Sequence, residues 1–576
     1  MSILVSKREF SESIDLGEIY VSKKCFIEYN KDLFCCCRGE FVNSDLQVLV
    51  DCILTNNTSK IQNIKGSFFC LIYDVRSQLL YVCNDKSGQL LLFYSTKNDF
   101  SISDDFWSVI KHDNYCLEDL DPLHMKLQIF AGASPDHKLF FKALNLLPNA
   151  VMVTVDCVSL EIKITKYWEF KFSKKTMTKE EKMLAIDSAF NDFYAFVESH
   201  NAKGIDYGLG ISGGMDSRII PYYAKKHNLN IKGFIIGEEK PHKLFKSNDF
   251  ISSEKIASYY DIPLQKVGYN SLSYEEQLKL DVKNCPCGSS QMFKIVDVDN
   301  LYFNVLLTGG SGFIPGSHPF DSYNKSEDIF CIIQNSQTNL FFKPKRYRIK
   351  KALNVVWPGL FNTNKIPIGD IKGVINKHET EQIEAIVKSY LRTLDSNSLL
   401  TERLMNYAIS ILGQRNYAGA FESLLGSCKS YTPYTTMFID LVSDWSEDDL
   451  YDRKLFLEFI RDKLPELANI RGQDYLPKLK FIQTSLFSKV FNLMRFIALG
   501  AGVMNYNNWG KHRTYIQFLN NKLNNSVIAN YIDVNVLINL FLKNRIDIAI
   551  INNVVKMNEI LNEISNEEKK CHIEKE

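Results

Sequence analysis

The sequence lacks the features that define several classes of protein. Its formal net charge is only +1, so its bulk composition gives no attraction to nucleic acid or to an anionic membrane surface. The first residues lack the apolar core of a signal peptide, and we therefore expect a cytoplasmic protein. Charged residues interrupt the two most apolar late stretches, near 487–503 and 534–555, which predicts buried helices and no membrane span.

The 14 cysteines also lack the spacing of a metal or disulfide framework. They are scattered along the chain apart from the runs at 35–37 and 285–287. Neither run is accompanied by a second ligand pair at zinc-finger spacing. Buried, reduced thiols are therefore the better interpretation.

What is present is the composition of an ordinary globular protein. Of 576 residues, 45% are hydrophobic and 23% are charged, and a chain of this length is too long for a single core. Short apolar runs between turn residues predict a layered, β-rich domain over residues 1–170. Strands that alternate with helices predict a parallel-sheet α/β domain over 171–565, helical toward its end. Residues 566–576 form a charged tail that we expect to be solvated or disordered.

One stretch carries most of the chemical information. A short apolar run enters Ser212-Gly213-Gly214 and leaves through Asp216 and Ser217 into an amphipathic segment. Glycines let backbone N–H groups approach phosphate oxygens, and the N-terminus of the following helix adds partial positive charge. Both serines can donate hydrogen bonds, whereas Asp216 is unsuited to a bare phosphate and is predicted to hold Mg²⁺. An ordinary turn with Ser212 as the helix N-cap is the alternative.

This string resembles the pyrophosphate loop of the ATP pyrophosphatases, which split ATP into AMP and pyrophosphate. Its extension to Arg218 narrows the resemblance to the synthetase domain of the asparagine synthetases and their relatives. The resemblance implies a parallel-sheet domain like those of the adenine nucleotide α-hydrolases, with ATP and Mg²⁺ as cofactors. It also implies that Ser212, Asp216 and Ser217 are catalytic.

The resemblance extends the nucleotide site to two further strand ends. Ile235, Ile236 and Gly237 end an apolar run that would border adenine and ribose, or that is plain core strand. Gly309 and Gly310 end another buried run, where the backbone can approach a ligand closely. The acidic pair that asparagine synthetases carry here is absent. Either Asp216 holds the metal with phosphates and water alone, or the site has diverged from that of the family.

The segment that closes the acceptor side of the cleft in asparagine synthetases is altered in this sequence. The family's aspartate is replaced by Thr435 or Thr436, and Lys429 lies close to the place of a family carboxylate. We therefore expect an acceptor other than aspartate, such as a small-molecule, peptide or sugar-acid carboxylate. Arg415 pairs either with a substrate carboxylate or phosphate, or with a protein carboxylate in a salt bridge.

The N-terminal part carries a second resemblance. The stretches 66–74 and 80–88 are similar to the second half of the class II glutamine amidotransferase domain, which implies an Ntn-hydrolase-like α+β fold. That domain uses a cysteine directly after the initiator methionine as its nucleophile, whereas this sequence has Ser2. The family's glutamine-holding segments have no clear counterpart. We expect a degenerate domain that is kept for structure and does not hydrolyse glutamine.

Taken together, the resemblance implies an amide ligase that activates a carboxylate. The carboxylate attacks the α-phosphate of ATP and gives an acyl-adenylate and pyrophosphate; ammonia or a substrate amine then displaces AMP. Two alternatives stay open, namely authentic asparagine synthesis and a nucleotide-binding pseudoenzyme or assembly subunit. We expect no nucleic-acid partner, and a homodimer is left open.

Overall fold

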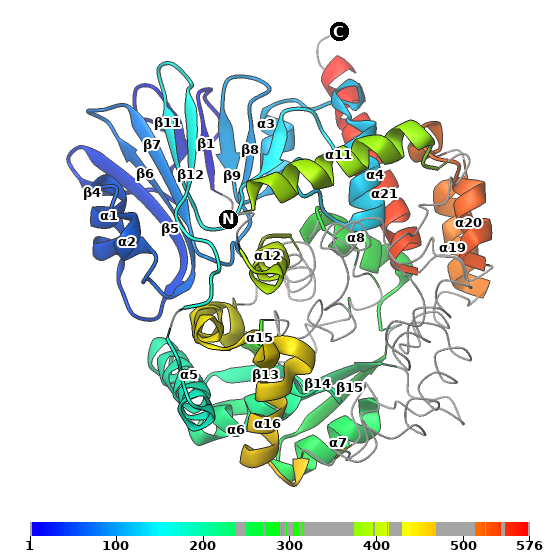
Figure 1. The fold of residues 1–576 in the computed structure, drawn as a ribbon. Helices are drawn as coiled ribbons and strands as arrows, with labels where there is room; N and C mark the ends of the chain where they lie inside the picture. The colour runs from blue at the N-terminus through cyan, green and yellow to red at the C-terminus, as the bar shows by residue number, and fades with distance from the viewer. Residues whose placement is uncertain are drawn as a thin grey trace.

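The computed structural model describes residues 3–173, 175–237, 249–268, 271–284, 286–288, 290, 292, 295, 303–309, 314–315, 374–394, 398–411, 413, 429–467, 470, 513–524, 526–542 and 548–573. Figure 1 shows two groups of strands at opposite ends of the molecule, with helices between and around them. The fold is mixed α/β, with antiparallel sheets first and a parallel sheet later in the chain.

Two six-stranded antiparallel sheets form from the N-terminal residues. In spatial order, the first sheet contains β10 (Leu144–Leu146), β8 (Phe93–Ser95), β9 (Ser101–Ser103), β1 (Leu4–Ser6), β3 (Tyr20–Ser22) and β2 (Ser13–Asp15). The second contains β12 (Ile162–Lys166), β11 (Val151–Asp156), β7 (Leu79–Asn84), β6 (Gly66–Asp74), β5 (Leu33–Phe41) and β4 (Ile27–Asn30).

The two antiparallel sheets pack face to face, as the alternation of side chains in β6 shows. Phe69 and Leu71 lie in the core that the second sheet shares with the first. Phe68 lies in a separate core beneath α1 (Leu46–Leu54) and α2 (Thr58–Ile61). Successive residues of a strand point to opposite faces, so an apolar run such as β6 is buried on both sides. The prediction of layered sheets is confirmed.

The cysteines lie mainly in these cores. Ten of the described cysteines are free thiols, and seven of them are buried while three are half-buried. Burial raises the pKa of the Cys35 thiol to about 11, which keeps that thiol protonated at neutral pH. The prediction of buried, reduced thiols is confirmed for most of the described cysteines.

The parallel sheet has five described strands. In spatial order these are β15 (Leu264–Gly268), β14 (Asn230–Gly237), β13 (Asp206–Gly210), β16 (Val305–Leu307) and β17 (Lys429–Tyr431). The helix that precedes the sheet begins after Thr178, which forms a capping box with Glu181. All strand pairs in this sheet are parallel, so their carboxyl ends share one edge.

Helices supply the rest of the described structure. Those on the N-terminal part are α3 (Phe106–His112), η1 (Leu117–Asp119) and α4 (Pro122–Ala131). Those that follow in the chain are α5 (Lys179–His200), α6 (Asp216–Lys226), α7 (Asp249–Tyr259), α8 (Tyr274–Asn284), α11 (Lys377–Thr393) and α12 (Leu400–Tyr407). The later ones are η7 (Tyr434–Phe438), α14 (Ile439–Leu441), η8 (Val442–Asp444), α15 (Glu447–Leu450), η9 (Tyr451–Arg453), α16 (Lys454–Lys463), α19 (Arg513–Leu523), η11 (Val527–Asn530), α20 (Val534–Leu542) and α21 (Ile548–Ile573).

The last helix packs against the N-terminal part of the chain. Apolar residues of α21 share one core with α4 and with the strand pair β8 and β10, and Figure 1 shows α4 beside α21. The predicted domain boundary near residue 170 stays a prediction, because this core contains residues from before and after the boundary. Helix α21 runs to Ile573, so the predicted disordered tail is helical over 566–573. A side-chain oxygen of Glu568 accepts a hydrogen bond from the Leu117 N–H at 2.6 Å, which holds this end of the helix.

The predicted buried helices near 534–555 are present as α20 and the first turns of α21, both rich in buried apolar residues. The companion stretch near 487–503 lies outside the described residues. Within the described part of the chain, no helix is long and apolar enough to cross a membrane.

Candidate functional site

The loop predicted to bind phosphate lies at the carboxyl end of β13, the middle strand of the parallel sheet. Residues 211–215 connect β13 to α6, which gives the predicted order of strand, turn and helix. Ile211 is buried and donates its N–H to the carbonyl of Phe234 at 2.8 Å, so the start of the loop continues the ladder with β14. Open parallel sheets bind ligands beyond this edge.

Within the loop, Ser212 folds back on the backbone. Its Oγ accepts a hydrogen bond from the N–H of Gly214 at 3.1 Å, as in a serine turn. The N-cap position of α6 is Met215, whose thioether is a weak acceptor. The alternative in which Ser212 caps the helix is therefore wrong. The positive end of the α6 dipole faces the loop.

Asp216, the first residue of α6, is engaged by two side chains from later in the chain. The hydroxyl of Tyr434 donates to Oδ1 at 2.6 Å. Nη2 of Arg453 lies 3.1 Å from Oδ1 and 3.4 Å from Oδ2. Burial, together with the neighbouring Asp216 carboxylate, raises the pKa of Tyr434 well above its ordinary value, so this phenol remains a donor. Tyr434 opens a π-helix, a rare form that occurs often at functional sites.

Gly309 packs directly against Asp216. A Cβ atom at Gly309 would lie 2.8 Å from the Cβ of Asp216 and 3.7 Å from Cδ1 of Ile220. Real Cβ atoms do not approach other atoms so closely, so only glycine fits at this position. The end of β16 and the start of α6 are thus in contact.

Behind the loop, Arg218 is fully buried at 0% exposure. Its Nη2 donates to the carbonyl of Gly213 at 2.9 Å, and its Nη1 donates to the carbonyl of Leu467 at 2.8 Å. Burial lowers the pKa of this guanidinium to about 10, so it remains charged at neutral pH. Arg218 therefore fixes the loop from its inner side.

The side chains around Asp216 do not fit a resident magnesium ion. Magnesium requires oxygen ligands in near-octahedral geometry. Both oxygens of Asp216 already face the guanidinium of Arg453, and Oδ1 also accepts from Tyr434. Across the part of the chain that the structure describes, no group of three His, Cys, Asp or Glu residues could hold a metal ion.

The structure brings some of the predicted site residues together. Ser212, Gly213, Gly214, Asp216 and Gly309 lie around the loop. The adenine candidates stand at the end of the neighbouring strand β14. Ile235 is buried there, Ile236 is half-buried beside Val267 and Phe303, and Gly237 is the last residue of the strand. Ser217 belongs to the first turn of α6.

Other predicted residues are not placed at the loop. Lys429 opens β17 and pairs in register with Val305, the first residue of β16. Its backbone therefore lies at the amino end of β17, toward the edge of the sheet opposite the loop, and its role in substrate binding stays a prediction. Gly310, Arg415 and Ser2 lie outside the described residues.

Sequence reasoning missed two residues of the site. These are Tyr434 and Arg453. Arg453 lies 237 residues from Asp216 in the sequence, and no local pattern marks the pairing. The one local signal is a tyrosine, aspartate and arginine run before an amphipathic helix.

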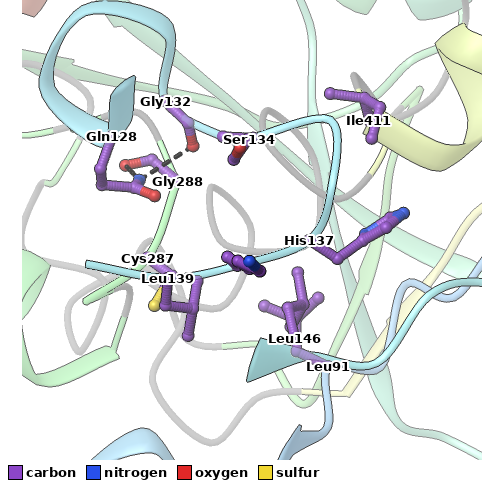
Figure 2. A pocket seen from close by; sticks show the side chains of 12 residues that line it. Leu91, Gln128, Gly132, Ser134, His137, Leu139, Leu146, Cys287, Gly288 and Ile411 are labelled. Atoms are coloured by element: carbon purple, nitrogen blue, oxygen red, sulfur yellow. Dashed lines mark hydrogen bonds between the residues drawn. The ribbon is translucent and has the colours of Figure 1, made fainter. Parts of the chain in front are cut away.

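A small cavity elsewhere is not a nucleotide site. Figure 2 shows it between the segment after α4 and the residues Cys287 and Gly288, where the Gln128 amide donates to the carbonyls of Gly132 and Gly288. Its volume is about 20 Å³, enough for one water molecule and far below the several hundred Å³ of a ligand pocket. None of the predicted site residues lines it.

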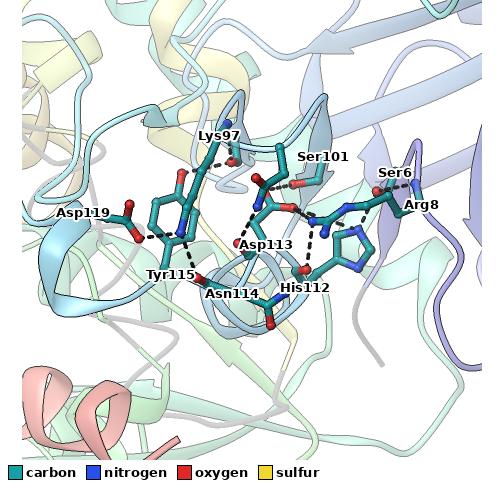
Figure 3. Close-up of polar contacts among 11 residues, drawn as sticks. Ser6, Arg8, Lys97, Ser101, His112, Asp113, Asn114, Tyr115 and Asp119 are labelled. Carbon is teal, nitrogen blue, oxygen red and sulfur yellow. Dashed lines mark hydrogen bonds and ion pairs between the residues drawn. The ribbon is translucent and has the colours of Figure 1, made fainter. Parts of the chain in front are cut away.

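A serine, histidine and aspartate group in the first antiparallel sheet is structural. Figure 3 shows Ser6, His112 and Asp113 together with Arg8. Ser6 Oγ lies 2.5 Å from Nε2 of His112, and Asp113 approaches the same nitrogen at 4.0 Å. A catalytic triad needs the acid on the other ring nitrogen. Asp113 instead accepts from Arg8 at 2.7 Å and from Ser101 at 2.8 Å, which ties β1, β9 and the end of α3 together.

Comparison with known proteins agrees with the resemblance that the loop carries. No protein-family model matches the chain. Among curated proteins, the glutamine-hydrolysing asparagine synthetase 1 of Bacillus subtilis is 24% identical over 229 residues, which is 39% of this chain and 34% of the relative. A Mycobacterium bovis protein, provisionally named a glutamine-hydrolysing asparagine synthetase, is 22% identical over 193 residues, which is 32% of this chain and 28% of the relative. Over about a third of its length, the chain is thus similar to asparagine synthetases.

The asparagine synthetase-like chain spans only 28–34% of the length of these relatives, so their activity is not transferred to it directly. A solved structure of glutamine phosphoribosylpyrophosphate amidotransferase from Bacillus subtilis, complexed with ADP and GMP, aligns with 44% of this chain and 74% of that protein. The identity is 12% and the TM-score is 0.19, too low for any argument.

Proposed function

We propose that this asparagine synthetase-like chain is an ATP-dependent amide ligase that forms AMP and pyrophosphate. One observation carries most of the proposal. The Ser212-Gly213-Gly214 loop lies at the carboxyl end of the central parallel strand, with Gly309 packed against Asp216 at the start of the next helix. Backbone N–H groups and a helix N-terminus at that edge form an arrangement suited to a polyphosphate. The names of the two relatives point to the same class of carbon–nitrogen ligase.

The proposed reaction has two steps. A substrate carboxylate oxygen attacks the α-phosphorus of ATP, the bond from that phosphorus to the bridging oxygen breaks, and pyrophosphate leaves. Ammonia or a substrate amine then attacks the acyl carbon, AMP departs with the carboxylate oxygen, and the nitrogen loses a proton. The Ser212 hydroxyl and the N–H groups at the start of α6 would stabilise the negative charge that develops on pyrophosphate.

The two ends of the site have different proposed partners. The adenine and ribose would lie toward Ile235, Ile236 and Gly237 on β14, whereas the acceptor would lie on the opposite side, beyond β16. Because Ser2 replaces the cysteine nucleophile of the amidotransferase domain, we propose that glutamine is not hydrolysed. The nitrogen would then come from ammonia or from the substrate's own amine. The acceptor class is a small-molecule, peptide or sugar-acid carboxylate.

The test is ATP-dependent release of AMP and pyrophosphate by the purified full chain, supplied with Mg²⁺ and a fractionated extract of the source cell. Asp216→Ala should abolish both products, because it removes the carboxylate that orders Tyr434 and Arg453. Asp206→Ala is the matched control. Asp206 is also ion-paired, 2.6 Å from Lys232, but it lies at the start of β13, at the end of that strand away from the loop. The Asp206→Ala variant should therefore retain activity. Release of ADP and phosphate would overturn the mechanism.

A nucleotide-binding pseudoenzyme is the second candidate, and one contact favours it. Arg453 already neutralises the carboxylate that was predicted to hold the metal. The pseudoenzyme predicts clear ATP binding by calorimetry with no AMP release from any extract fraction. Authentic asparagine synthesis would be recognised by activity with aspartate and ammonia alone.

A further inference from the structure

Arg453 stands in an unusual place in the backbone. It is the last residue of η9 and the N-cap of α16, with φ at +55°, a left-handed conformation that residues other than glycine adopt rarely. Such conformations cost of order 1 kcal/mol and persist where the surroundings fix them, often at functional sites. Here the guanidinium lies 5.3 Å from the centre of the Phe456 ring, and its Nη2 contacts Asp216. The side chain is therefore aimed at the start of α6.

Two further features indicate that an anion belongs at this loop. Arg218 is a fully buried cation whose Nη2 contacts the loop at Gly213, and its Nε has no hydrogen-bond acceptor among the residues that the structure describes. Helix α6 has 11 residues and directs its positive end at the same loop. A carboxylate at that end would repel a phosphate unless a cation accompanies it.

We infer that Arg453 supplies the positive charge that binds the pyrophosphate part of the nucleotide at the Ser212-Gly213-Gly214 loop, and that Asp216 holds Arg453 ready and is not a magnesium ligand. The inference rests on the proposed function and deepens it. A guanidinium has five N–H donors in a planar fork that matches phosphate oxygens, so it can contact a carboxylate and a phosphate together. In this chain the arginine takes the place at Asp216 where a metal ion was expected.

Binding of inorganic pyrophosphate to the full-length protein tests the inference without turnover. Isothermal titration calorimetry would be run in EDTA and again with Mg²⁺. The parent protein should bind pyrophosphate in EDTA. Arg453→Ala should bind about tenfold or more weakly in both buffers, since a hydrogen bond to a charged group is lost. Arg453→Lys should fall between them, because lysine keeps the charge and loses the fork.

Two other variants separate the arginine from a metal site. Asp216→Asn keeps a carbonyl oxygen for Tyr434 and Arg453 but is a poor magnesium ligand, so adding Mg²⁺ should change the Kd for pyrophosphate by the same factor in this variant as in the parent. Arg461→Ala removes an arginine later in the same helix, α16, and should bind like the parent. Urea midpoints would show that each variant is folded.

Three results would overturn the inference. These are unchanged binding by Arg453→Ala, no binding by the parent in EDTA, and binding that requires Mg²⁺ and disappears in Asp216→Asn. A different result would refute the proposed function. If pyrophosphate binding depends on Arg453 but ATP gives no AMP, the ligase proposal fails and the inference stands.

Discussion

Replacing Arg218 with methionine should weaken nucleotide binding at the loop while costing the fold little stability. Arg218 is fully buried and donates to the carbonyl groups of Gly213 and Leu467. Methionine is also unbranched and apolar along its length, but it has no donor for either carbonyl. The substitution therefore removes one hydrogen bond to the loop and one to the segment after α16.

Two opposing effects set the size of the stability change. Leaving two buried carbonyl groups without a donor costs about 1–3 kcal/mol each. Against this, burial lowers the pKa of Arg218 from 12.5 to about 10, which corresponds to a cost of about 3 kcal/mol for keeping the guanidinium charged in the interior. Methionine removes that cost. We therefore expect the free energy of unfolding to fall by about 3 kcal/mol at most.

Binding should weaken as well, because the Gly213 carbonyl would lose its hydrogen bond to Arg218 and the peptide could turn. Turning this peptide reorients loop N–H groups that the proposed nucleotide site needs, and one such donor is worth about 3 kcal/mol at a developing oxyanion. We expect the Kd for ATP to rise at least about tenfold in Arg218→Met. Arg218→Lys is the matched control, since it keeps the charge but its ammonium cannot span both carbonyls as a fork does.

Urea denaturation followed by tryptophan fluorescence gives the stability change, and calorimetry with ATP gives the Kd. An Arg218→Met variant that binds ATP as the parent does would refute the argument that this side chain fixes the loop. A loss of more than about 5 kcal/mol of stability would refute the balance between lost donors and relieved burial of charge.

Two further predictions follow from single contacts. Gly309→Ala should move α6 away from β16, because the new Cβ would lie 2.8 Å from the Cβ of Asp216; we expect weaker ATP binding and a stability loss of about 1–3 kcal/mol, and an unchanged Kd would contradict the close packing. His124 is buried, which disfavours its charge, yet its contacts to Asp121 and Asp136 raise its pKa to about 9. The stability that this histidine contributes should be fully present below its ordinary pKa of 6.5 and lost as the pH rises through 9. The parent and His124→Gln should therefore differ in unfolding free energy by about 3 kcal/mol less at pH 9.5 than at pH 6. A constant difference over that range would show that His124 is not charged in the fold.

The loop could be predicted from sequence because its determinants are local. A strand, two glycines and a helix start follow one another within a few residues, and the parallel neighbours of β13 follow from the alternation of strands with helices. The pairing of Asp216 with Tyr434 and Arg453 could not be predicted in this way. It depends on which side chains the later helices bring to α6, and that is decided by packing over more than 200 residues of sequence.

The backbone position of Lys429 shows a second limit of sequence reasoning. An apolar pattern can predict that a strand exists, but which of its ends meets the ligand depends on its register with β16. The charged end of the chain shows a third limit. Composition predicted a solvated or disordered tail. Helix α21 nevertheless continues into these charged residues, because its earlier turns are buried against α4 and a helix extends readily once it has formed.

The contacts of the N-terminal sheets give them a structural role that does not depend on glutamine hydrolysis. The hydroxyl of Tyr431 donates to Glu40 of β5 at 2.6 Å, so the last residue of β17 is tied to the second antiparallel sheet. Lys86, which follows β7 and whose side chain is only 7% exposed, pairs with Asp440 in α14, the short helix that follows the π-helix. Both contacts flank Tyr434, which in turn donates to Asp216. The N-terminal sheets therefore hold the segment that carries Tyr434 against the loop. A chain that lost these sheets would lose the support of its proposed nucleotide site even if no glutamine is ever cleaved there.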